Sequence, residues 1–289
     1  NIGSIENQGY ELSIESDNLT GAFSWTTAFN IAFNRNKVLE LGGEEYKEMA
    51  EGDGHLKTGS VRRLIVGEPI GVFYGYRFDG IFQNEEECKQ QTSSASPIGV
   101  GLRRYKDLNG DGKVDAANDR EILGDANPKF FGGLTNTFAY KGFELNVFLQ
   151  YSYGNKILNY NAMELENPTG GQNAYADMVN RWTPENPSNI YPKATTNRAL
   201  LVSDRFIEDG SYLKLKTLSL SYSFPKINLK HIQGLRLYVT GQNLLTWTKY
   251  RGYDPEVSYR GASTLEAGED FGGYPQSRTF MFGIKLDIK

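Results

Sequence analysis

The segment 128–153 constrains the fold of this chain more than any other part of the sequence. In its second half, apolar and polar side chains alternate with a period of two residues, which indicates a β-strand with two different faces. A similar strand precedes it, and the dipeptide Lys141-Gly142 between them has the length and the glycine of a tight hairpin turn. Such a turn fixes the register and places Tyr140 opposite Phe143. The segment therefore predicts an antiparallel hairpin with one apolar, aromatic face and one face of small and polar side chains.

Two architectures accommodate this hairpin, a soluble β-sandwich and a membrane β-barrel. Each strand is about 11 residues long, which is the length that a tilted strand needs to cross a bilayer. The apolar face carries Tyr and Phe side chains towards its ends, as an aromatic girdle at a membrane interface does. One polar residue, Asn136, interrupts that face. These details favour a barrel and leave the sandwich as the alternative.

The composition excludes several classes of protein. The formal net charge is -4, so no basic surface indicates nucleic-acid binding. No apolar run reaches the roughly 18 residues of a membrane helix, whereas a barrel needs no such run. Cys88 is the only cysteine, and His55 and His231 have no second candidate ligand nearby, so we expect no internal disulfide and no thiolate metal cluster. The sequence contains no G-x-S-x-G, H-E-x-x-H or Walker motif, and we expect no enzymatic activity. Because Asp and Glu are plentiful, a β-rich hydrolase with a glycosidase pair stays as the weakest alternative.

The strand 23–33 shows the alternation most clearly. Aromatic and aliphatic side chains fill most of its odd positions, while Ser, Thr, Ala and Asn fill its even positions. A face of such small polar side chains suits the wall of a wet lumen better than the core of a sandwich. We therefore expect the odd face to meet lipid and the even face to meet the lumen of a barrel.

About seven strands are recognisable, and the connections between them alternate between short and long. We expect short connections near Leu19, Lys141 and 225–234, and long connections, here called the first, second and third excursions, at 37–127, 154–209 and 250–275. Tight turns at one end and long loops at the other are typical of outer-membrane barrels. Because an open sheet edge is not tolerated in lipid, seven strands require further strands on the N-terminal side, so we expect the chain to be a piece of something longer. Short strands are expected in the first excursion, and a short helix at 174–182 in the second.

The run 107–115 matches the start of an EF-hand calcium loop, in which oxygen ligands alternate along a tight turn. Gly112 permits the sharp bend, and many hard ligands on flexible backbone suit Ca²⁺ better than Mg²⁺. Asn118 stands where the acid of the twelfth position is expected, and a one-residue bulge would bring in Asp119 instead. The predicted ligands of a structural calcium ion are Asp107, Asn109, Asp111, the Lys113 carbonyl and Asp119. An acidic, glycine-rich turn without metal is the alternative.

Six segments, in order and spacing, resemble the C-terminal part of the SusC/RagA family of TonB-linked outer-membrane transporters. They are GVFYGYRFDGIFQ, DLNGDGKVDAANDREILGDANPKFFGGL, YGNKI, NRWTPENP, RFIEDGSYLKLKTLSLSYSFP and LRLYVTGQNLLTWTKYRGYDPEV. Each segment alone is a modest signal, whereas six in order are specific, and the resemblance extends from about Tyr10 to the C-terminus. Two features depart from the family. The calcium loop is one residue longer than in the family between Val114 and Asp119. The chain also ends in Ile288-Lys289, where members often finish on an aromatic residue.

The resemblance implies that residues 1–289 are the C-terminal part of a transmembrane antiparallel β-barrel of 22 strands, whose plug domain, TonB-binding segment and N-terminal strands lie upstream. It implies the outer membrane as the location, with the C-terminus in the periplasm and the excursions outside the cell. It further implies TonB-dependent import of an oligosaccharide or a peptide, with a SusD-like surface lipoprotein as lid. We expect that lipoprotein to bury apolar loop residues such as Phe73, Tyr74 and Tyr76. The alternative function is a secreted all-β carbohydrate-binding module with a structural calcium site.

Overall fold

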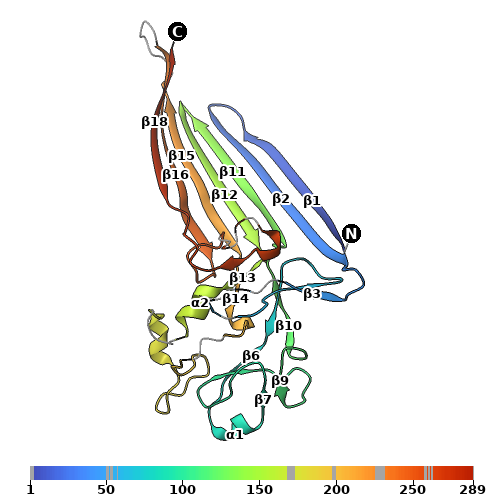
Figure 1. Ribbon diagram of the computed structural model, residues 1–289. Coiled ribbons are helices and arrows are strands. Elements are labelled where there is room, and N and C mark those ends of the chain that lie inside the picture. Colours follow the sequence, from blue (N-terminus) through green and yellow to red (C-terminus); the bar gives the residue numbers. More distant parts are fainter. Residues whose placement is uncertain are drawn as a thin grey trace.

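The computed structural model describes residues 3–49, 52, 55–56, 58–167, 173–196, 200–224, 232–256, 259, 261 and 263–288. A tall seven-stranded sheet stands on a unit of loops, short strands and short helices (Figure 1). All neighbouring strands of this sheet are antiparallel, and its spatial order follows the chain, as an up-and-down barrel wall requires. Its strands in order are β1 (Ser4–Leu19), β2 (Phe23–Glu40), β11 (Phe130–Tyr140), β12 (Phe143–Tyr153), β15 (Tyr212–Ser223), β16 (Ile232–Thr248) and β18 (Thr279–Ile288).

The hairpin of β11 and β12 has the predicted register, with Tyr140 opposite Phe143 and Phe130 opposite Tyr153. Its turn consists of Lys141 and Gly142, whose φ angles are 48° and 87°. Positive φ at both turn residues gives the connection a twist that matches that of the strands. The two-residue spacing thus sets which side chains face each other along both strands.

The two faces of the sheet differ as the alternation predicts. Phe29 on β2 lies opposite Ile14 on β1 and Leu134 on β11, whereas its neighbour Ala28 lies opposite a glutamate and a threonine on the same two strands. Large apolar side chains of this sheet remain uncovered in the described part of the chain, and Phe282 on β18 is 82% exposed. A water-facing protein surface seldom carries an apolar area that extends over a whole sheet. The apolar face therefore has the character of a surface that meets lipid.

Asn136, the polar residue on the apolar face, is not left without partners. Its side-chain oxygen accepts a hydrogen bond from Trp25 Nε1 at 2.8 Å and another from Thr27 Oγ1 at 2.8 Å. Both donors lie on β2, the strand that pairs with β11. Because an unpaired polar group in hydrocarbon is costly, these bonds explain how the face accommodates an asparagine.

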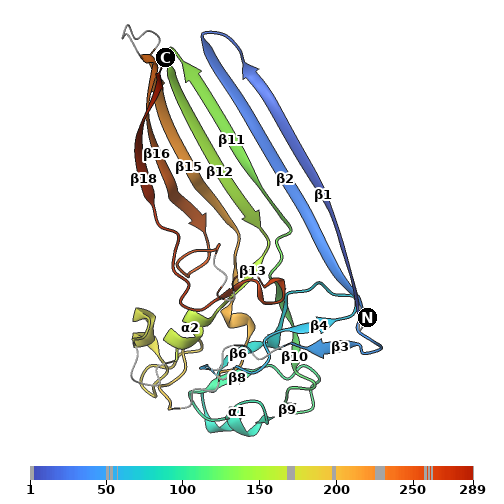
Figure 2. The same ribbon diagram turned by 45° about the horizontal axis from the view of Figure 1, so that its top comes forward.

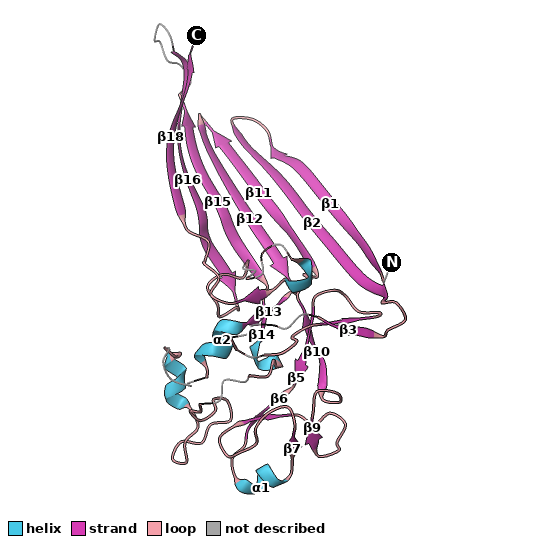
Figure 3. Cartoon of the chain, in the orientation of Figure 1, coloured by secondary structure: helices cyan, strands magenta, loops and turns pink. Residues whose placement is uncertain are grey.

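The three excursions all leave the same end of the sheet, while the short connections lie at the other end (Figures 1 and 2). The predicted connection 225–234 lies mostly outside the described residues. Figure 3 shows that the helices of the described chain all lie in the excursions. The elements of the first excursion are β3 (Tyr46–Glu48), β4 (Arg63–Ile65), β5 (Val72–Tyr76), β6 (Phe78–Ile81), α1 (Glu85–Lys89), β7 (Thr92–Ser93), β8 (Arg103–Tyr105), β9 (Lys113–Val114) and β10 (Arg120–Asp125). The second contains β13 (Lys156–Asn159), α2 (Tyr160–Leu165), the 3₁₀ helices η1 (Ala176–Asn180) and η2 (Asp204–Phe206), and β14 (Ile207–Asp209), and the third contains η3 (Thr264–Glu266) and β17 (Glu269–Asp270).

The helix predicted at 174–182 forms only as the short 3₁₀ helix η1. No helix in the described ranges has the length and apolar character that a membrane span would need.

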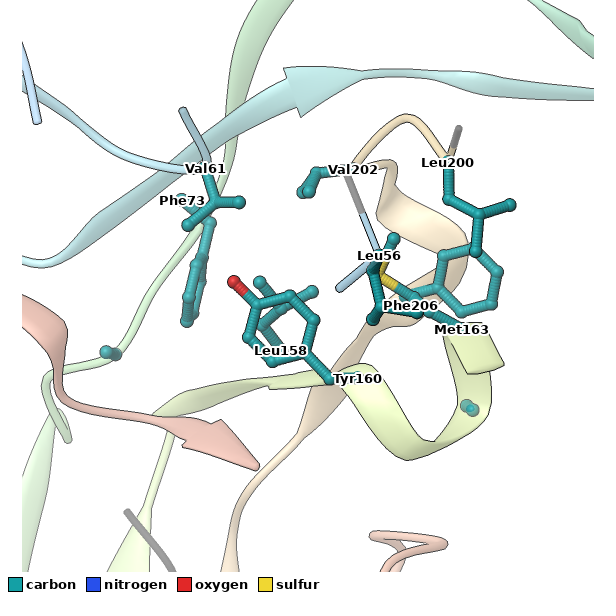
Figure 4. Packing of buried hydrophobic residues seen from close by; sticks show 11 residues of the cluster. Leu56, Val61, Phe73, Leu158, Tyr160, Met163, Leu200, Val202 and Phe206 are labelled. Atoms are coloured by element: carbon teal, nitrogen blue, oxygen red, sulfur yellow. The ribbon is translucent and has the colours of Figure 1, made fainter. Parts of the chain in front are cut away.

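The excursions form one unit, here called the loop unit, which has a hydrophobic core of its own. Val61 and Phe73 from the first excursion lie in one cluster of buried residues with Tyr160 and Phe206 from the second (Figure 4). Phe271 of the third excursion packs edge-on against Tyr160, with 6.0 Å between the ring centroids. Because all three excursions contribute to one core, none of them is an independent, loosely attached loop.

The expectation that Phe73 and Tyr76 need a partner protein to bury them is wrong. Phe73 is 0% and Tyr76 5% exposed within this chain alone. Tyr74 is half-buried, and the guanidinium of Arg63 lies 3.9 Å from the centroid of its ring. The loop unit satisfies these aromatic residues internally, so any partner must contact other residues.

Candidate functional site

The acidic loop predicted to bind calcium is a tight turn, which the backbone amides organise. Asp107 accepts hydrogen bonds from the amides of Gly110 and Gly112, both at 2.7 Å. Asp111 accepts one from the Lys113 amide at 2.8 Å, and the Asp111 amide in turn donates to Asn109 Oδ1 at 3.1 Å. The φ angles of Gly110 and Gly112 are 76° and 81°, a conformation that glycine adopts without strain. The conformation of the two glycines therefore lets the acidic side chains accept hydrogen bonds from backbone amides of their own loop.

Asp119 and Asn118 take different places in this loop. Asp119 is 0% exposed, and its carboxylate accepts the amides of Leu108 at 2.8 Å and Asp115 at 2.7 Å. Asn118 is exposed, and its amide donates to Asp115 Oδ1 at 3.0 Å. The residue by which this loop exceeds the EF-hand pattern lies in one further turn. A hydrogen bond from the Asp119 amide to the Asp115 carbonyl closes that turn. The loop thus turns Asp119 inward and Asn118 outward.

The donor chemistry of the loop fits a hard divalent cation. Asp107, Asp111 and Asp119 form no ion pair with a lysine or arginine in the part of the chain that the structure describes. The hydrogen bonds that these carboxylates accept come from amide groups, and each carboxylate oxygen retains a second lone pair. On the other hand, no three His, Cys, Asp or Glu side chains among the described residues stand close enough together to form a ready-made ligand set. The geometry therefore brings the predicted residues into one loop without fixing them as ligands.

Glu166 joins the second and third excursions through a buried cluster of charges. Its carboxylate is 1% exposed and pairs with Arg205 at 2.6 Å and with Arg251 at 3.0 Å. Arg251 also contacts Glu208 at 2.8 Å. The backbone carbonyl of Glu166 accepts a bond from Arg103 of the first excursion at 3.1 Å. One residue after α2 therefore contacts all three excursions.

Lys214 attaches the third excursion to the sheet. It lies on β15 opposite Gln150, on the polar face, and it is 1% exposed. Its ammonium group contacts Asp254 at 3.0 Å and also Glu256, which pairs with Lys216 at 2.9 Å. Burial acts to raise the pKa of the Glu256 carboxyl, but the bonds from the two lysines outweigh it and hold that pKa below its ordinary value. The start of the third excursion is thus clamped to the inner wall of the sheet.

A third buried group of charges, the pair of Arg62 and Glu269, joins the first and third excursions at 2.9 Å, and both side chains are 3% exposed.

Sequence reasoning missed these three charge clusters because their members are separated by up to 207 residues. The one local signal was Lys214, a charged residue at a polar-face position of a strand. No feature of the sequence identified its partners in advance.

The comparisons with known proteins agree on one family. No family model matches the chain. A TonB-dependent receptor P3 of Formosa agariphila is 40% identical over 293 aligned residues, which cover 99% of this chain and 29% of that protein. The TonB-dependent receptor SusC of Bacteroides thetaiotaomicron is 28% identical over 301 residues, which cover 100% of this chain and 27% of that protein. Among solved structures, that of the RagAB peptide transporter matches with a TM-score of 0.76 at 24% identity, over 99% of this chain and 30% of that chain.

An antiparallel sheet with one apolar and one polar face, all of whose long loops leave from one end, defines a segment of an outer-membrane β-barrel. The chain is similar over almost its whole length to TonB-dependent receptors, SusC among them, and the resemblance predicted from the sequence is confirmed. It spans about three tenths of the length of the curated relatives that it matches. These relatives are receptors and transporters by name rather than enzymes.

Proposed function

We propose that this chain is part of the barrel of a TonB-dependent transporter that imports an oligosaccharide or a peptide across the outer membrane. The observation that carries the proposal is the fusion of all three excursions into one packed loop unit at a single end of the sheet. Such a unit provides a rigid rim around a lumen, on which a cargo and a partner can bind. The similarity to these proteins supports this direction, since they are named as receptors and transporters.

The proposal includes an orientation in the membrane. The loop unit faces the outside of the cell, and the short connections together with the C-terminus face the periplasm, where TonB acts on a part of the transporter outside residues 1–289. Long loops outside and tight turns in the periplasm are the rule for bacterial barrels. Attaching a protease-sensitive tag between Gly110 and Asp111 and another at Gly142 tests this. Protease added to intact cells is expected to cut the first tag and to leave the second uncut, and the reverse pattern contradicts the orientation.

The cargo class requires a direct measurement. Cells that lack the full-length transporter and cells that carry it are given labelled oligosaccharides in one arm and labelled peptides in the other. Uptake that depends on both the transporter and TonB in one of the two arms is expected and identifies the class. Equal uptake with and without the transporter in both arms contradicts the import function.

A SusD-like lipoprotein is the proposed partner, and its contacts differ from those first expected. Since Phe73 and Tyr76 are buried internally, the apolar residues open to a partner are those that remain exposed on the loop unit, such as Val179 at 76% and Ile190 at 50%. Purification of the full-length transporter in mild detergent is expected to recover a lipoprotein in comparable amount. The double variant V179E/I190E should lose it while the amount of barrel is unchanged. E185Q, at an exposed polar position of the same excursion, serves as the control and should keep it.

Calcium in the acidic loop is the second proposal. Three carboxylates without cationic partners repel one another, and an ion held by Asp107, Asn109, Asp111, the Lys113 carbonyl and Asp119 would remove this repulsion. An affinity on the order of 10⁻⁴–10⁻³ M, as in extracellular calcium modules, would give substantial occupancy outside the cell. The role is structural, because all these residues come from one loop that leads into the wall strand β11.

Limited proteolysis of the full-length protein tests the calcium site. Chelation is expected to increase cleavage between Gly110 and Asn127, and D111A should be cleaved equally with and without calcium. The control D79N changes an exposed acid that pairs with Arg104 in the same excursion, and it should keep the calcium response. A wild-type loop that is equally sensitive with calcium and with chelator contradicts this proposal.

A further inference from the structure

A hollow lies on the apolar face of the sheet, at the end of β12, β15 and β16 that joins the loop unit (Figure 1). Its volume is about 620 Å³, within the range of pockets that hold a small organic molecule. Its floor contains Tyr151, Leu213 and Trp247, which lie side by side on these three strands. Trp247 is 51% exposed, so the chain leaves part of this floor uncovered. The hollow therefore opens onto the surface that the barrel assignment turns towards lipid.

The aromatic residues of the hollow are held in place by contacts within the sheet. The Tyr151 hydroxyl donates a hydrogen bond to the Asn30 carbonyl at 2.8 Å. Phe130 stacks on Tyr153, with 5.0 Å between the ring centroids. Tyrosine and tryptophan side chains at the end of an apolar strand face are typical of the interface between hydrocarbon and water, because such side chains have an apolar body and a polar tip. The hollow is therefore at the level of the lipid headgroups.

The rim of the hollow carries two opposite charges, Lys249 and Asp209. Lys249 is exposed, and in the described ranges of the chain it forms no ion pair. Asp209 Oδ1 accepts hydrogen bonds from the amide and the hydroxyl of Ser211, at 3.0 and 2.6 Å, whereas Asp209 Oδ2 accepts none within the described residues. Burial acts to raise the pKa of the Asp209 carboxyl, but these bonds and the positive charges of Lys156 and Lys249 outweigh it and hold that pKa below its ordinary value. The rim thus presents one ammonium group and one ionised carboxylate oxygen, both open to a ligand.

We propose that this hollow binds one membrane lipid with a phosphoethanolamine headgroup. The phosphate pairs with the Lys249 ammonium group, the ammonium group of the lipid donates to Asp209 Oδ2, and the acyl chains lie along the apolar face. A headgroup with a phosphate alone would leave Asp209 facing a like charge, whereas this headgroup complements both charges of the rim. The exposed face of Trp247 also attracts a cation. The site depends on the assignment of the sheet to a barrel wall and is independent of cargo import.

Native mass spectrometry of the full-length protein, purified in detergent and freed of lipid, tests the proposal with three phospholipids that share palmitoyl and oleoyl chains. Phosphatidylethanolamine carries both charged groups, phosphatidylglycerol lacks the ammonium group, and phosphatidylcholine has a quaternary ammonium group that cannot donate a hydrogen bond. We expect phosphatidylethanolamine to bind most tightly and the other two to bind more weakly by roughly threefold to tenfold, because water partly screens contacts at an open rim. Soluble glycerophosphoethanolamine, which lacks acyl chains, should bind more weakly by roughly tenfold or more, and equal binding of it would contradict a lipid as the occupant.

Two variants assign the contacts, and a lysine elsewhere on the loop unit provides the control. K249Q should weaken the binding of all three phospholipids by roughly threefold to tenfold, whereas D209N should remove the preference for phosphatidylethanolamine over phosphatidylglycerol. K106Q changes an exposed lysine of the first excursion that does not line the hollow, and it should bind the phospholipids as the wild type does. If D209N does not fold, K249Q and the order of the three phospholipids still decide. Equal affinity of the wild type for the three phospholipids, an unchanged preference in D209N, or equal losses in K249Q and K106Q would overturn the proposal.

Discussion

Replacing Glu166 with glutamine tests whether buried charges hold the loop unit together. The carboxylate makes two contacts, to Arg205 at 2.6 Å and to Arg251 at 3.0 Å. Glutamine keeps the shape and one acceptor oxygen, but it removes the negative charge and places an amide N–H group against a guanidinium N–H group. Two arginines of different excursions then remain beside each other with no opposing charge from this residue.

The magnitude follows from the burial of the partners. Removing one member of a buried ion pair destabilises a protein by about 3–5 kcal/mol. Arg205 is 14% exposed, whereas Arg251 is 45% exposed, so water screens part of the second contact. We therefore expect E166Q to destabilise the loop unit by about 3 kcal/mol, at the lower end of that range. The matched control is E121Q, because Glu121 pairs with Arg77 and these side chains are 37% and 42% exposed, which predicts a loss of about 0–1 kcal/mol.

Hydrogen exchange of backbone amides in the full-length protein provides the assay, since it reports the local free energy of opening. A loss of about 3 kcal/mol corresponds to exchange that is on the order of 100-fold faster. This acceleration is expected in α2, β14 and η2, with little change in the sheet strands. Equal acceleration by E166Q and E121Q would refute the argument that burial, rather than the mere presence of an ion pair, decides the effect.

Three further outcomes follow from the same contacts. The folded-state pKa of Glu256 is depressed, so the stability that its contacts with Lys214 and Lys216 contribute is present above the ordinary pKa of 4.5 and is lost as the pH falls through the folded pKa. Hydrogen exchange of the amides of 250–256 should therefore accelerate only in acid, and E256Q should remove this pH dependence. Phe73 is 0% exposed in the core of the loop unit, and F73A should lower the stability of that unit by about 3–5 kcal/mol without releasing the protein from the membrane. A loss of membrane insertion would contradict the view that the core of the loop unit and the sheet are stabilised independently. At Gly142, with φ of 87°, an added Cβ would meet the Ser223 carbonyl oxygen at 2.6 Å, so G142A should lower the unfolding temperature of the barrel. K141N should leave this temperature unchanged, because asparagine tolerates the positive φ of that position.

The strands of the barrel wall could be predicted from the sequence because their faces and the register of the hairpin depend on residues close together in the chain. A period of two residues gives the faces, and the spacing of Lys141 and Gly142 gives the register of the hairpin. Besides the single interruption at Asn136, the pattern fails where the backbone is irregular. Around Asn243, with φ of 52°, the pairing of β15 and β16 shifts between Leu215 and Thr217, and the alternation of side chains is interrupted there.

The loop unit could not be predicted in the same way. Its core and its charge clusters join residues such as Arg62 and Glu269, which lie 207 positions apart, and no local pattern links them. For the same reason Phe73 was expected to need a partner, although residues of the second excursion cover it. The acidic loop is the exception, since its spacing correctly indicated a tight turn around Gly112, while the metal itself remains a prediction.

The most direct test of the central claim compares two adjacent residues near the middle of β2. If the sheet is a barrel wall with its odd-numbered face towards lipid, F29R places a charge in the hydrocarbon layer, and A28R places it in the lumen. The full-length protein, folded into lipid vesicles and titrated with denaturant, should lose roughly 2–4 kcal/mol of stability with F29R and much less with A28R. Equal losses for the two variants, or a larger loss for A28R, would contradict the assignment of this sheet to a membrane barrel.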